Sequence, residues 1–547
     1  MRRVLAVGCC LALGSACGDD ATSLPSADTG SGTAVATTNP TTTAAADETG
    51  PSLTSTTETA DSTDSEIEPD PVALPFAHGI RLTRMTANQA TQVQLVADGV
   101  EVAEADYNTR IISGRTTLLR AFWSLHADFV PRELIGRLVA DYPDGTQLVQ
   151  DFPLMVEGDS SDGGASFQWL LQPEQVVPGI RYRVRILEAT EDGAEGELSD
   201  PPPILPLAGR GTLGVYDVPL EMEVVLVPVL HQWEGEECMP DILEEDVTAL
   251  RNRLEQYNPL QRALVTVGDP MPYTDSIAMG GGFSPILSAL AQHRAQENPE
   301  PQVYYYGLLD SCDGFPGGLG GQALGIPPLP PTPEMAGQRV STGRWNGSGE
   351  NASETFVHEV GHSQGRYHVV CSGGEAGPDL AYPHPNGRIG VWGFGIHDFQ
   401  LRSPGGARDY MTYCSNEFVS DYSWELTMGV IEILTDWAIN GVPENSNAPG
   451  LLWGAEYASG GEDWWTTAGD LPTAAITPGA SLVVETATGS HTLPAWVYVR
   501  PDSDTVQFVA PRPDLHDVVA LDWVHPDRVA PSRVPLAEIR DLVVTAP

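Results

Sequence analysis

Residues 358–368 read HEVGHSQGRYH, and the spacing of their histidines decides how the rest of the chain is interpreted. His358 and His362 are four residues apart, so they lie on one face of a helix, about one turn from each other. Gly365 accepts the left-handed backbone that ends a helix, so the chain can turn and bring His368 to the same point. Three neutral imidazoles leave a fourth position open for water, which is typical of a catalytic zinc site.

The helix that carries the first two histidines has a predicted start and a predicted buried face. Asn351 is the expected N-cap, and Glu354 stands three residues later at the capping-box position. The apolar face that would pack against a sheet consists of Phe356, Val357 and Val360. The sequence therefore predicts a helix that begins after Asn351 and ends at Gly365.

The pattern HExxHxxGxxH matches the metzincin clan of zinc metallopeptidases residue for residue. That clan also has a Met-turn beneath the metal, and Met411 in the segment DYMTY, residues 409–413, resembles it. The resemblance covers roughly residues 210–441. It implies an α/β (α+β) catalytic domain, with a twisted five-stranded sheet above and a lower part closed by a helix. Val369, which follows the third histidine, fits no family within the clan.

The resemblance also implies a role for each residue of the motif. His358, His362 and His368 would hold one catalytic zinc ion, and Glu359 would take a proton from the water that zinc activates and return it to the leaving amine. Tyr413 resembles the clan's tyrosine that either ligates zinc or hydrogen-bonds the oxyanion, with packing under the site as the alternative. Met411 would be structural. A calcium ion is compatible with the clan, but no motif supports one.

Three functions remain open at this point. The first is a zinc endopeptidase that cuts extracellular or surface proteins or glycoproteins. The second is an inactive or highly latent metzincin-fold lipoprotein that serves binding or adhesion, although the complete set of Glu359, Tyr413 and three histidines argues against loss of activity. The third is zinc-dependent hydrolysis of something other than peptide.

The catalytic domain is expected at residues 209–445, where the pattern alternates between strands and helices. The expected strands are 223–230, 263–267 and 302–309, and the expected helices are 241–257, 284–296 and 420–440. The glycine-rich run 317–325 resembles the clan's antiparallel edge strand, against which an extended substrate could pair. A surface loop is the alternative for that run.

We expect a multidomain chain in which β-sandwich-like domains flank the catalytic domain. Short alternating apolar runs separated by turn residues predict a β-sandwich at residues 72–208. Similar alternation predicts a C-terminal β-rich domain at residues 446–547.

The N-terminus indicates export. Residues 1–17 resemble a lipoprotein-type signal peptide, with cleavage before Cys17 and lipidation of its thiol; ordinary cleavage beside an incidental Cys17 is the alternative. Residues 18–71 form a linker rich in Thr, Ser, Ala and Asp that cannot bury enough apolar surface to fold, so we expect it to be disordered. The predicted location is a bacterial cell surface or outer membrane, or the secreted fraction.

Four cysteines remain after processing: Cys238, Cys312, Cys371 and Cys414. In an exported chain an even number suggests two disulfides, and four cysteines allow three connectivities. The resemblance favours Cys371–Cys414, because both segments would meet under the zinc, and Cys238–Cys312, because their strands would be neighbours in the clan's sheet. A structural zinc site is the alternative, but no CxxC spacing supports it.

The charge of the chain excludes one class of partner. Its 547 residues include 74 acidic and 28 basic side chains, all of the latter Arg, for a formal net charge of -46. Binding to nucleic acid requires clustered cations, so we expect none. For the same reason we expect contact with a membrane only through the N-terminal lipid anchor. We also expect a monomer.

Overall fold

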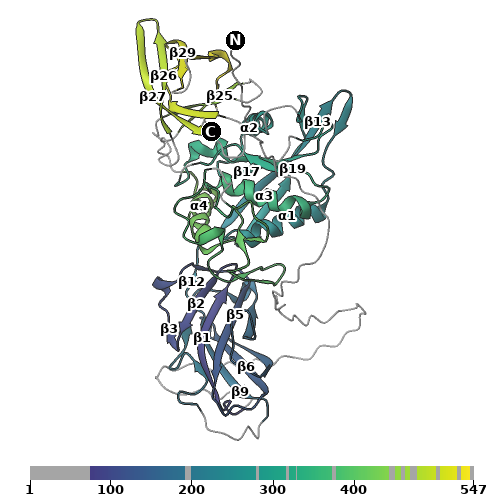
Figure 1. Cartoon of the computed structure of the whole chain (residues 1–547), viewed down its shortest axis with the longest axis vertical. Helices are drawn as coiled ribbons and strands as arrows, with labels where there is room; N and C mark the ends of the chain where they lie inside the picture. Colours follow the sequence, from purple (N-terminus) through teal and green to yellow (C-terminus); the bar gives the residue numbers. More distant parts are fainter. Residues whose placement is uncertain are drawn as a thin grey trace, which may run out of the picture.

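The computed structural model describes residues 74–190, 199–278, 283–315, 320–327, 329–372, 377–442, 450–456, 462–468, 477–499, 506–525 and 531–541. These residues form several β-sheets and four α-helices, arranged as three regions along the long axis of the molecule (Figure 1). The predicted signal peptide, Cys17 and the linker 18–71 lie outside the described residues.

The N-terminal region consists of two antiparallel sheets that share one hydrophobic core. The first sheet has the order β3-β2-β1-β5-β8, and the second has the order β10-β9-β6-β7, with β11 also paired to β9. The strands are β1 (Ile80–Asn88), β2 (Gln92–Ala97), β3 (Val100–Glu101), β5 (Thr117–Leu125), β6 (Arg132–Asp141), β7 (Gln147–Val156), β8 (Phe167–Leu171), β9 (Arg181–Glu188), β10 (Ile204–Leu205) and β11 (Gly211–Thr212). Inward-facing side chains such as Leu119, Trp123, Leu138 and Ile186 fill the space between the sheets.

The central region is built on one mostly parallel sheet. Its main order is β15-β13-β17-β19-β18, and only β18 of these five runs antiparallel to its neighbour. The strands are β13 (Glu221–Trp233), β15 (Arg262–Val267), β17 (Tyr304–Leu309), β18 (Gly321–Ala323) and β19 (Val340–Arg344). Two short strands, β14 (Glu236–Cys238) and β16 (Met271–Tyr273), also pair with β13, so the sheet has seven strands where five were expected.

Helices cover both faces of this sheet because its strands are apolar on both sides. The helices are α1 (Glu244–Tyr257), α2 (Ser284–Glu297), α3 (Gly349–Ser363) and α4 (Asp421–Asn440). Helices α1, α3 and α4 share one core with Val224 of β13 and Tyr306 of β17. Helix α2 packs on the opposite face against Val227 and Tyr305. The lower loops carry β20 (Gly393–Phe394), β21 (Leu401–Arg402), β22 (Arg408–Asp409) and β23 (Glu417–Phe418).

The start of α3 differs from the prediction. Its N-cap is Ser348, which has an extended backbone and whose hydroxyl accepts a hydrogen bond from the backbone N–H of Asn351. Asn351 already lies inside the helix, so the predicted capping box with Glu354 is wrong. Ser is as good an N-cap as Asn, and here it stands one turn earlier.

The C-terminal region is one sheet of eight strands in the order β30-β29-β26-β27-β28-β24-β25-β31, in place of the two sheets of a sandwich. The strands are β24 (Gly450–Glu456), β25 (Glu462–Ala468), β26 (Thr477–Thr486), β27 (Gly489–Val499), β28 (Val506–Pro511), β29 (Val518–Val524), β30 (Ser532–Val534) and β31 (Arg540–Asp541). Trp453 and Trp465 stack at 6.3 Å between ring centroids and form a cluster with Met335 of the central region. That cluster joins the two regions.

The N-terminal and central regions are joined through their backbones as well as their side chains. Strand β12 (Val215–Tyr216) returns from the start of the central region to pair with β4 (Ile111–Ile112). The backbone N–H of Phe394 donates to the carbonyl oxygen of Ala90 at 2.7 Å. Nearby, Arg110 forms an ion pair with Glu425 of α4 at 3.1 Å.

Arg115 is a deeply buried polar link between these two regions. Its side chain is only 2% exposed, and its guanidinium donates to the carbonyl oxygens of Gln89, Leu260 and Glu255 at 3.1, 2.6 and 2.7 Å. Two of these carbonyls belong to the last turn of α1 and the loop after it, where backbone acceptors have no partner within the helix. Burial lowers the pKa of Arg115 to about 9.

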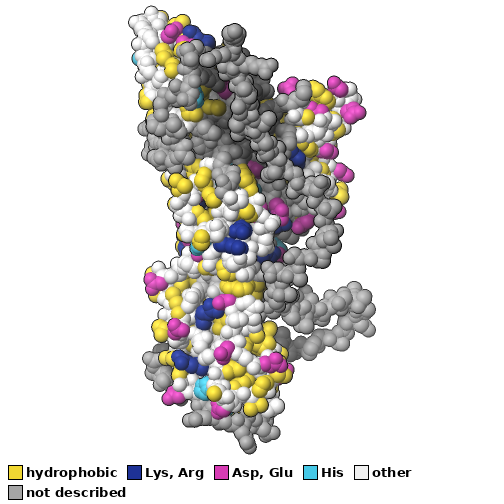
Figure 2. All heavy atoms as spheres, viewed as in Figure 1, with side chains coloured by type: hydrophobic (Ala, Val, Ile, Leu, Met, Phe, Trp, Pro, Cys, Tyr) yellow, Lys and Arg dark blue, Asp and Glu magenta, His cyan; other side chains and the backbone are white. Residues whose placement is uncertain are grey.

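Acidic side chains are prominent on the visible face, and none of the described helices qualifies as membrane-spanning. Acidic side chains are scattered over the visible face and outnumber the basic ones there (Figure 2). None of the helices within the described ranges is both long enough and apolar enough to cross a bilayer.

Replacing Arg115 by Met should weaken the contact between the N-terminal and central regions and so lower the stability of the protein. We expect Arg115→Met to lower the free energy of unfolding by about 2–4 kcal/mol, because it leaves buried carbonyl oxygens without a donor. The exposed pair Arg262–Glu221 offers a control, since Arg262→Met should cost about 0.5 kcal/mol or less. Urea unfolding of both variants measures this, and equal losses would contradict the assignment.

Candidate metal centre

Helix α3 places His358, Glu359 and His362 on the side that faces the core of the lower region. All three side chains are nearly buried, with exposed fractions of 8%, 6% and 2%. Helix α3 is fixed between β17 and α1, because Phe356 and Val360 belong to the same core as Tyr306 and Leu250. The ligands therefore project from a rigid element.

The third histidine reaches the centre through a sharp turn. Gly365 has a φ of +82°, and a Cβ at this position would approach the carbonyl oxygen of Pro327 to 2.8 Å. The following N–H of Arg366 donates back to the carbonyl of Gly361 at 3.0 Å. The chain then brings His368, which is fully buried, beside the other two histidines, as the sequence predicted.

Backbone carbonyls orient two of the three imidazoles. Nδ1 of His358 lies 2.8 Å from the carbonyl oxygen of Tyr410, and Nδ1 of His362 lies 2.7 Å from that of Arg366. A carbonyl oxygen can only accept, so both Nδ1 atoms carry the proton and both Nε2 atoms present a lone pair. This is the arrangement that metal-ligating histidines usually have.

The three nitrogens are close enough to share one ion. Their ligand atoms all lie within 4.8 Å of one another, and Nε2 of His362 is 3.0 Å from Nε2 of His368. Two imidazole nitrogens on a tetrahedral zinc, each at 2.0–2.1 Å, are roughly 3.3 Å apart. The residues therefore fit a metal ion, and among the described residues they form the one such cluster.

Met411 lies in a tight turn directly beneath the helix. It is fully buried, and a Cβ at Gly361 would come within 2.6 Å of its sulfur, which explains the glycine inside the motif. The carbonyl of Met411 accepts from the N–H of Val369 at 2.9 Å, next to the third histidine. The turn thus supports two segments that carry histidines.

Asp409 fixes this turn, and the sequence analysis did not identify it. One carboxylate oxygen accepts from the N–H of Met411 at 3.0 Å, and the other accepts from the N–H and the hydroxyl of Ser420, the N-cap of α4. Asp409 is fully buried, and this burial raises the pKa of its carboxyl group. Its position two residues before Met411 in the sequence could have indicated that it belongs to this turn.

Tyr413 lies over the histidines on the solvent side. Its ring centroid is 4.6 Å from that of His368 and 5.9 Å from that of His358, and the side chain is 54% exposed. The Tyr413 side chain is therefore accessible to a ligand from the solvent.

Two disulfides link segments of the central region. Cys371 is bonded to Cys414, so the segment after His368 is linked to the residue after Tyr413. The second bond joins Cys238, the last residue of β14, to Cys312, which lies just after β17. Both pairings agree with those that the resemblance favoured.

Strand β18 lies along one side of the centre. Gly321 of β18 is so close to the helix that a Cβ there would lie 2.7 Å from Cγ of Glu359. Gln322 points to the other face, where its side-chain oxygen accepts from the N–H of Phe283 at 3.1 Å. The glycine-rich run thus contains an edge strand, although residues 316–319 lie outside the described ranges.

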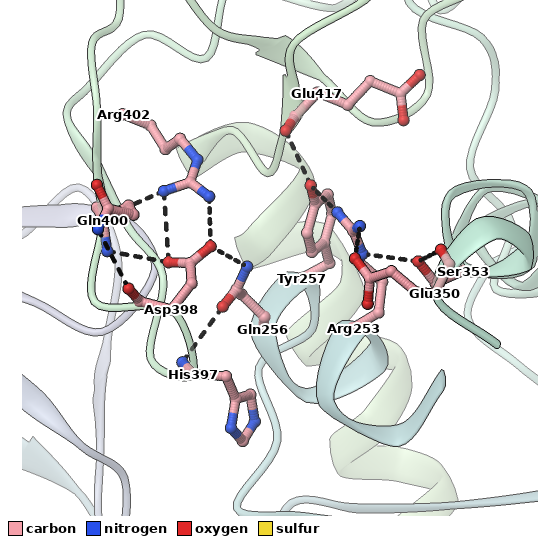
Figure 3. Close-up of polar contacts among 10 residues, drawn as sticks. All are labelled: Arg253, Gln256, Tyr257, Glu350, Ser353, His397, Asp398, Gln400, Arg402 and Glu417. Atoms are coloured by element: carbon pink, nitrogen blue, oxygen red, sulfur yellow. Dashed lines mark hydrogen bonds and ion pairs between the residues drawn. The ribbon is translucent and has the colours of Figure 1, made fainter. Parts of the chain in front are cut away.

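Helix α1 connects α3 to the lower loops through polar side chains (Figure 3). Arg253 donates to the hydroxyl of Ser353 at 3.0 Å and to Glu350 at 3.3 Å, both on α3. Tyr257 donates to the carbonyl oxygen of Glu417 at 2.8 Å. On the other side of α1, Gln256, His397, Asp398, Gln400 and Arg402 form a second hydrogen-bonded group.

Glu417 should make stability depend on pH. Burial and the negative charges of Glu354 and Asp409 raise its pKa to about 8, against the opposing effect of Arg253. In the unfolded chain the group titrates near its ordinary value, so between about pH 4.5 and 8 the folded state alone keeps the proton. The contribution of Glu417 to stability is therefore present at low pH and is lost as pH rises towards 8.

We therefore expect Glu417→Gln to raise Tm relative to wild type at pH 8 and to have less effect at pH 5. Thermal unfolding at both values tests this. Glu350→Gln is the matched control, because it removes a mostly exposed carboxylate that also contacts Arg253. A Tm difference for Glu417→Gln that stays constant with pH would contradict the assignment.

Comparison with known proteins neither supports nor opposes a metal centre at these histidines. Protein-family models, curated proteins and solved structures were each compared with the chain, and none of the three comparisons found a match.

Proposed function

We propose that the chain is a zinc-dependent endopeptidase of the metzincin clan. The convergence of His358, His362 and His368 on one point carries this proposal, because carbonyl groups already orient two of their rings for a metal. Three nitrogen ligands with an open fourth position are typical of catalytic rather than structural zinc. The sheet order β15-β13-β17-β19-β18 and the turn at Met411 support the same clan.

The residues of the chain divide the chemistry between them. A bound zinc ion would supply Lewis-acid chemistry that acidifies water and polarises a carbonyl group. Glu359 would accept the proton of the attacking water at its carboxylate and deliver it to the leaving nitrogen of the cut bond. The hydroxyl of Tyr413 would donate a hydrogen bond to the substrate carbonyl oxygen as negative charge develops there.

The edge strand β18 is the proposed guide for the substrate. An extended peptide can add to an exposed strand edge through main-chain hydrogen bonds. Gly321 of the edge strand β18 lies beside Glu359, with no side chain of its own between them. A protein or glycoprotein segment that is extended where it is cut is therefore the proposed substrate.

The disulfides suggest that the protein works in an oxidising, extracellular environment. Beyond this, we propose that it is anchored through a lipid on Cys17 and acts as a monomer on extracellular or cell-surface proteins.

Replacing the proposed base should abolish hydrolysis without removing the metal. We expect Glu359→Gln to lower kcat/KM by about 10²–10⁴-fold on an unfolded-protein substrate, because no other group would then accept the proton. Wild type and variant should both contain about one zinc per chain by elemental analysis. Chelator-sensitive activity equal in the two proteins would refute the role of Glu359.

Removing a proposed zinc ligand should abolish metal binding as well as hydrolysis. We expect His362→Ala to lose zinc and activity together, because two remaining imidazoles bind zinc too weakly. His491→Ala on β27 removes an exposed histidine of the C-terminal region and should keep both. Full zinc content in His362→Ala would show that the metal binds elsewhere.

A further inference from the structure

Tyr306 of the central strand β17 places a buried hydroxyl group between β19 and the helix α3 that carries the histidines. The side chain is fully buried, and its ring packs edge-on against Phe356 of α3 at 4.8 Å between centroids. The hydroxyl lies under the neighbouring strand β19 at Gly343, where an added Cβ would overlap it. Gly343 therefore provides the space that this hydroxyl occupies.

Glu359 approaches the same small area from the helix. Gly321 and Gly343 are directly opposite each other on β18 and β19, and such partners have Cβ positions about 4.5–5.5 Å apart. Added Cβ atoms at Gly321 and Gly343 would meet the methyl group of Thr355 at 2.6 and 3.1 Å. The glycine pair thus forms a floor on which Thr355, the Tyr306 hydroxyl and the stem of Glu359 converge.

The hydroxyl of Tyr306 needs an acceptor at this position. The oxygen atom is buried, and none of the described residues is within hydrogen-bond geometry of it. A buried hydroxyl without a partner is destabilising. Burial raises the pKa of Tyr306 well above its ordinary value, and the negative charge of Glu359 adds to this effect. The group therefore stays protonated and remains a donor.

We propose that Tyr306 is a positioning residue for Glu359, and that its hydroxyl donates a hydrogen bond to the Glu359 carboxylate in the zinc-loaded protein. The terminal torsion of a glutamate is soft, so its carboxylate can turn towards the hydroxyl without moving the helix. The hydrogen bond fixes one carboxylate oxygen and leaves the other directed at the reacting water. This catalytic consequence rests on the proposed function, whereas the contact itself does not.

A double-mutant cycle on the zinc-loaded full chain tests the contact without any assay of activity. We expect Tyr306→Phe to lower Tm by about 2–4 °C in wild type, and to have no such effect in the Glu359→Ala background, where the acceptor is absent. If the Tm changes of the two single variants add up to that of the double variant, the proposal is overturned, regardless of any catalytic activity.

Kinetics test the consequence. Tyr306→Phe should lower kcat about 10-fold while KM and zinc content stay unchanged, because only the orientation of the base is affected. Tyr304→Phe is the matched control: it lies two residues away on the same face of β17, is equally buried, and should leave kcat unchanged. A kcat for Tyr306→Phe within twofold of wild type, or a fall that follows zinc loss, would overturn the positioning role.

The two proposals fail in distinguishable ways. If wild type hydrolyses no peptide substrate but the cycle shows coupling between Tyr306 and Glu359, the proposed function is wrong and the contact stands. If wild type is active and the cycle is additive, the protease stands and Tyr306 is only part of the core.

Discussion

The structure around the metal centre depends on two backbone carbonyl groups that each hold an imidazole by its Nδ1 atom. The carbonyl of Tyr410 holds His358, and the carbonyl of Arg366 holds His362. Because these carbonyls belong to the turn at Met411 and to the turn after α3, both turns must be in place before the nitrogens can converge. The buried Asp409, the glycine at 361 and the disulfide Cys371–Cys414 all serve to keep them there.

Contacts with the other two regions also support the central region that holds the histidines. Helix α1 holds α3 through Arg253, and its last turn is in contact with the N-terminal sheets through Arg115. The N-terminal region therefore helps to support the helix that carries His358 and His362, rather than being a separate attachment. The C-terminal sheet contacts the central region at the cluster of Trp453, Trp465 and Met335.

Much of this arrangement follows from local sequence, and the exceptions have physical reasons. The histidine spacing, the glycine at 365 and the alternation of strands and helices are short-range signals, so α3, its turn and the main strands were predictable. The buried hydroxyl of Tyr306 was not, because in the run YYYGLL a tyrosine whose hydroxyl lacks a partner looks the same in sequence as one that only fills a core. Arg115 was not predictable either, since its three acceptors are brought together only by the packing of two regions. The N-cap of α3 moved by one turn because Ser348 and Asn351 have similar capping strength.

X-ray absorption at the zinc edge of the purified full chain measures directly whether the three histidines hold one zinc ion. We expect a first shell of three imidazole nitrogens at about 2.0–2.1 Å with oxygen in the remaining position. A shell that contains sulfur at about 2.3 Å, or one with fewer than three imidazoles, would contradict it.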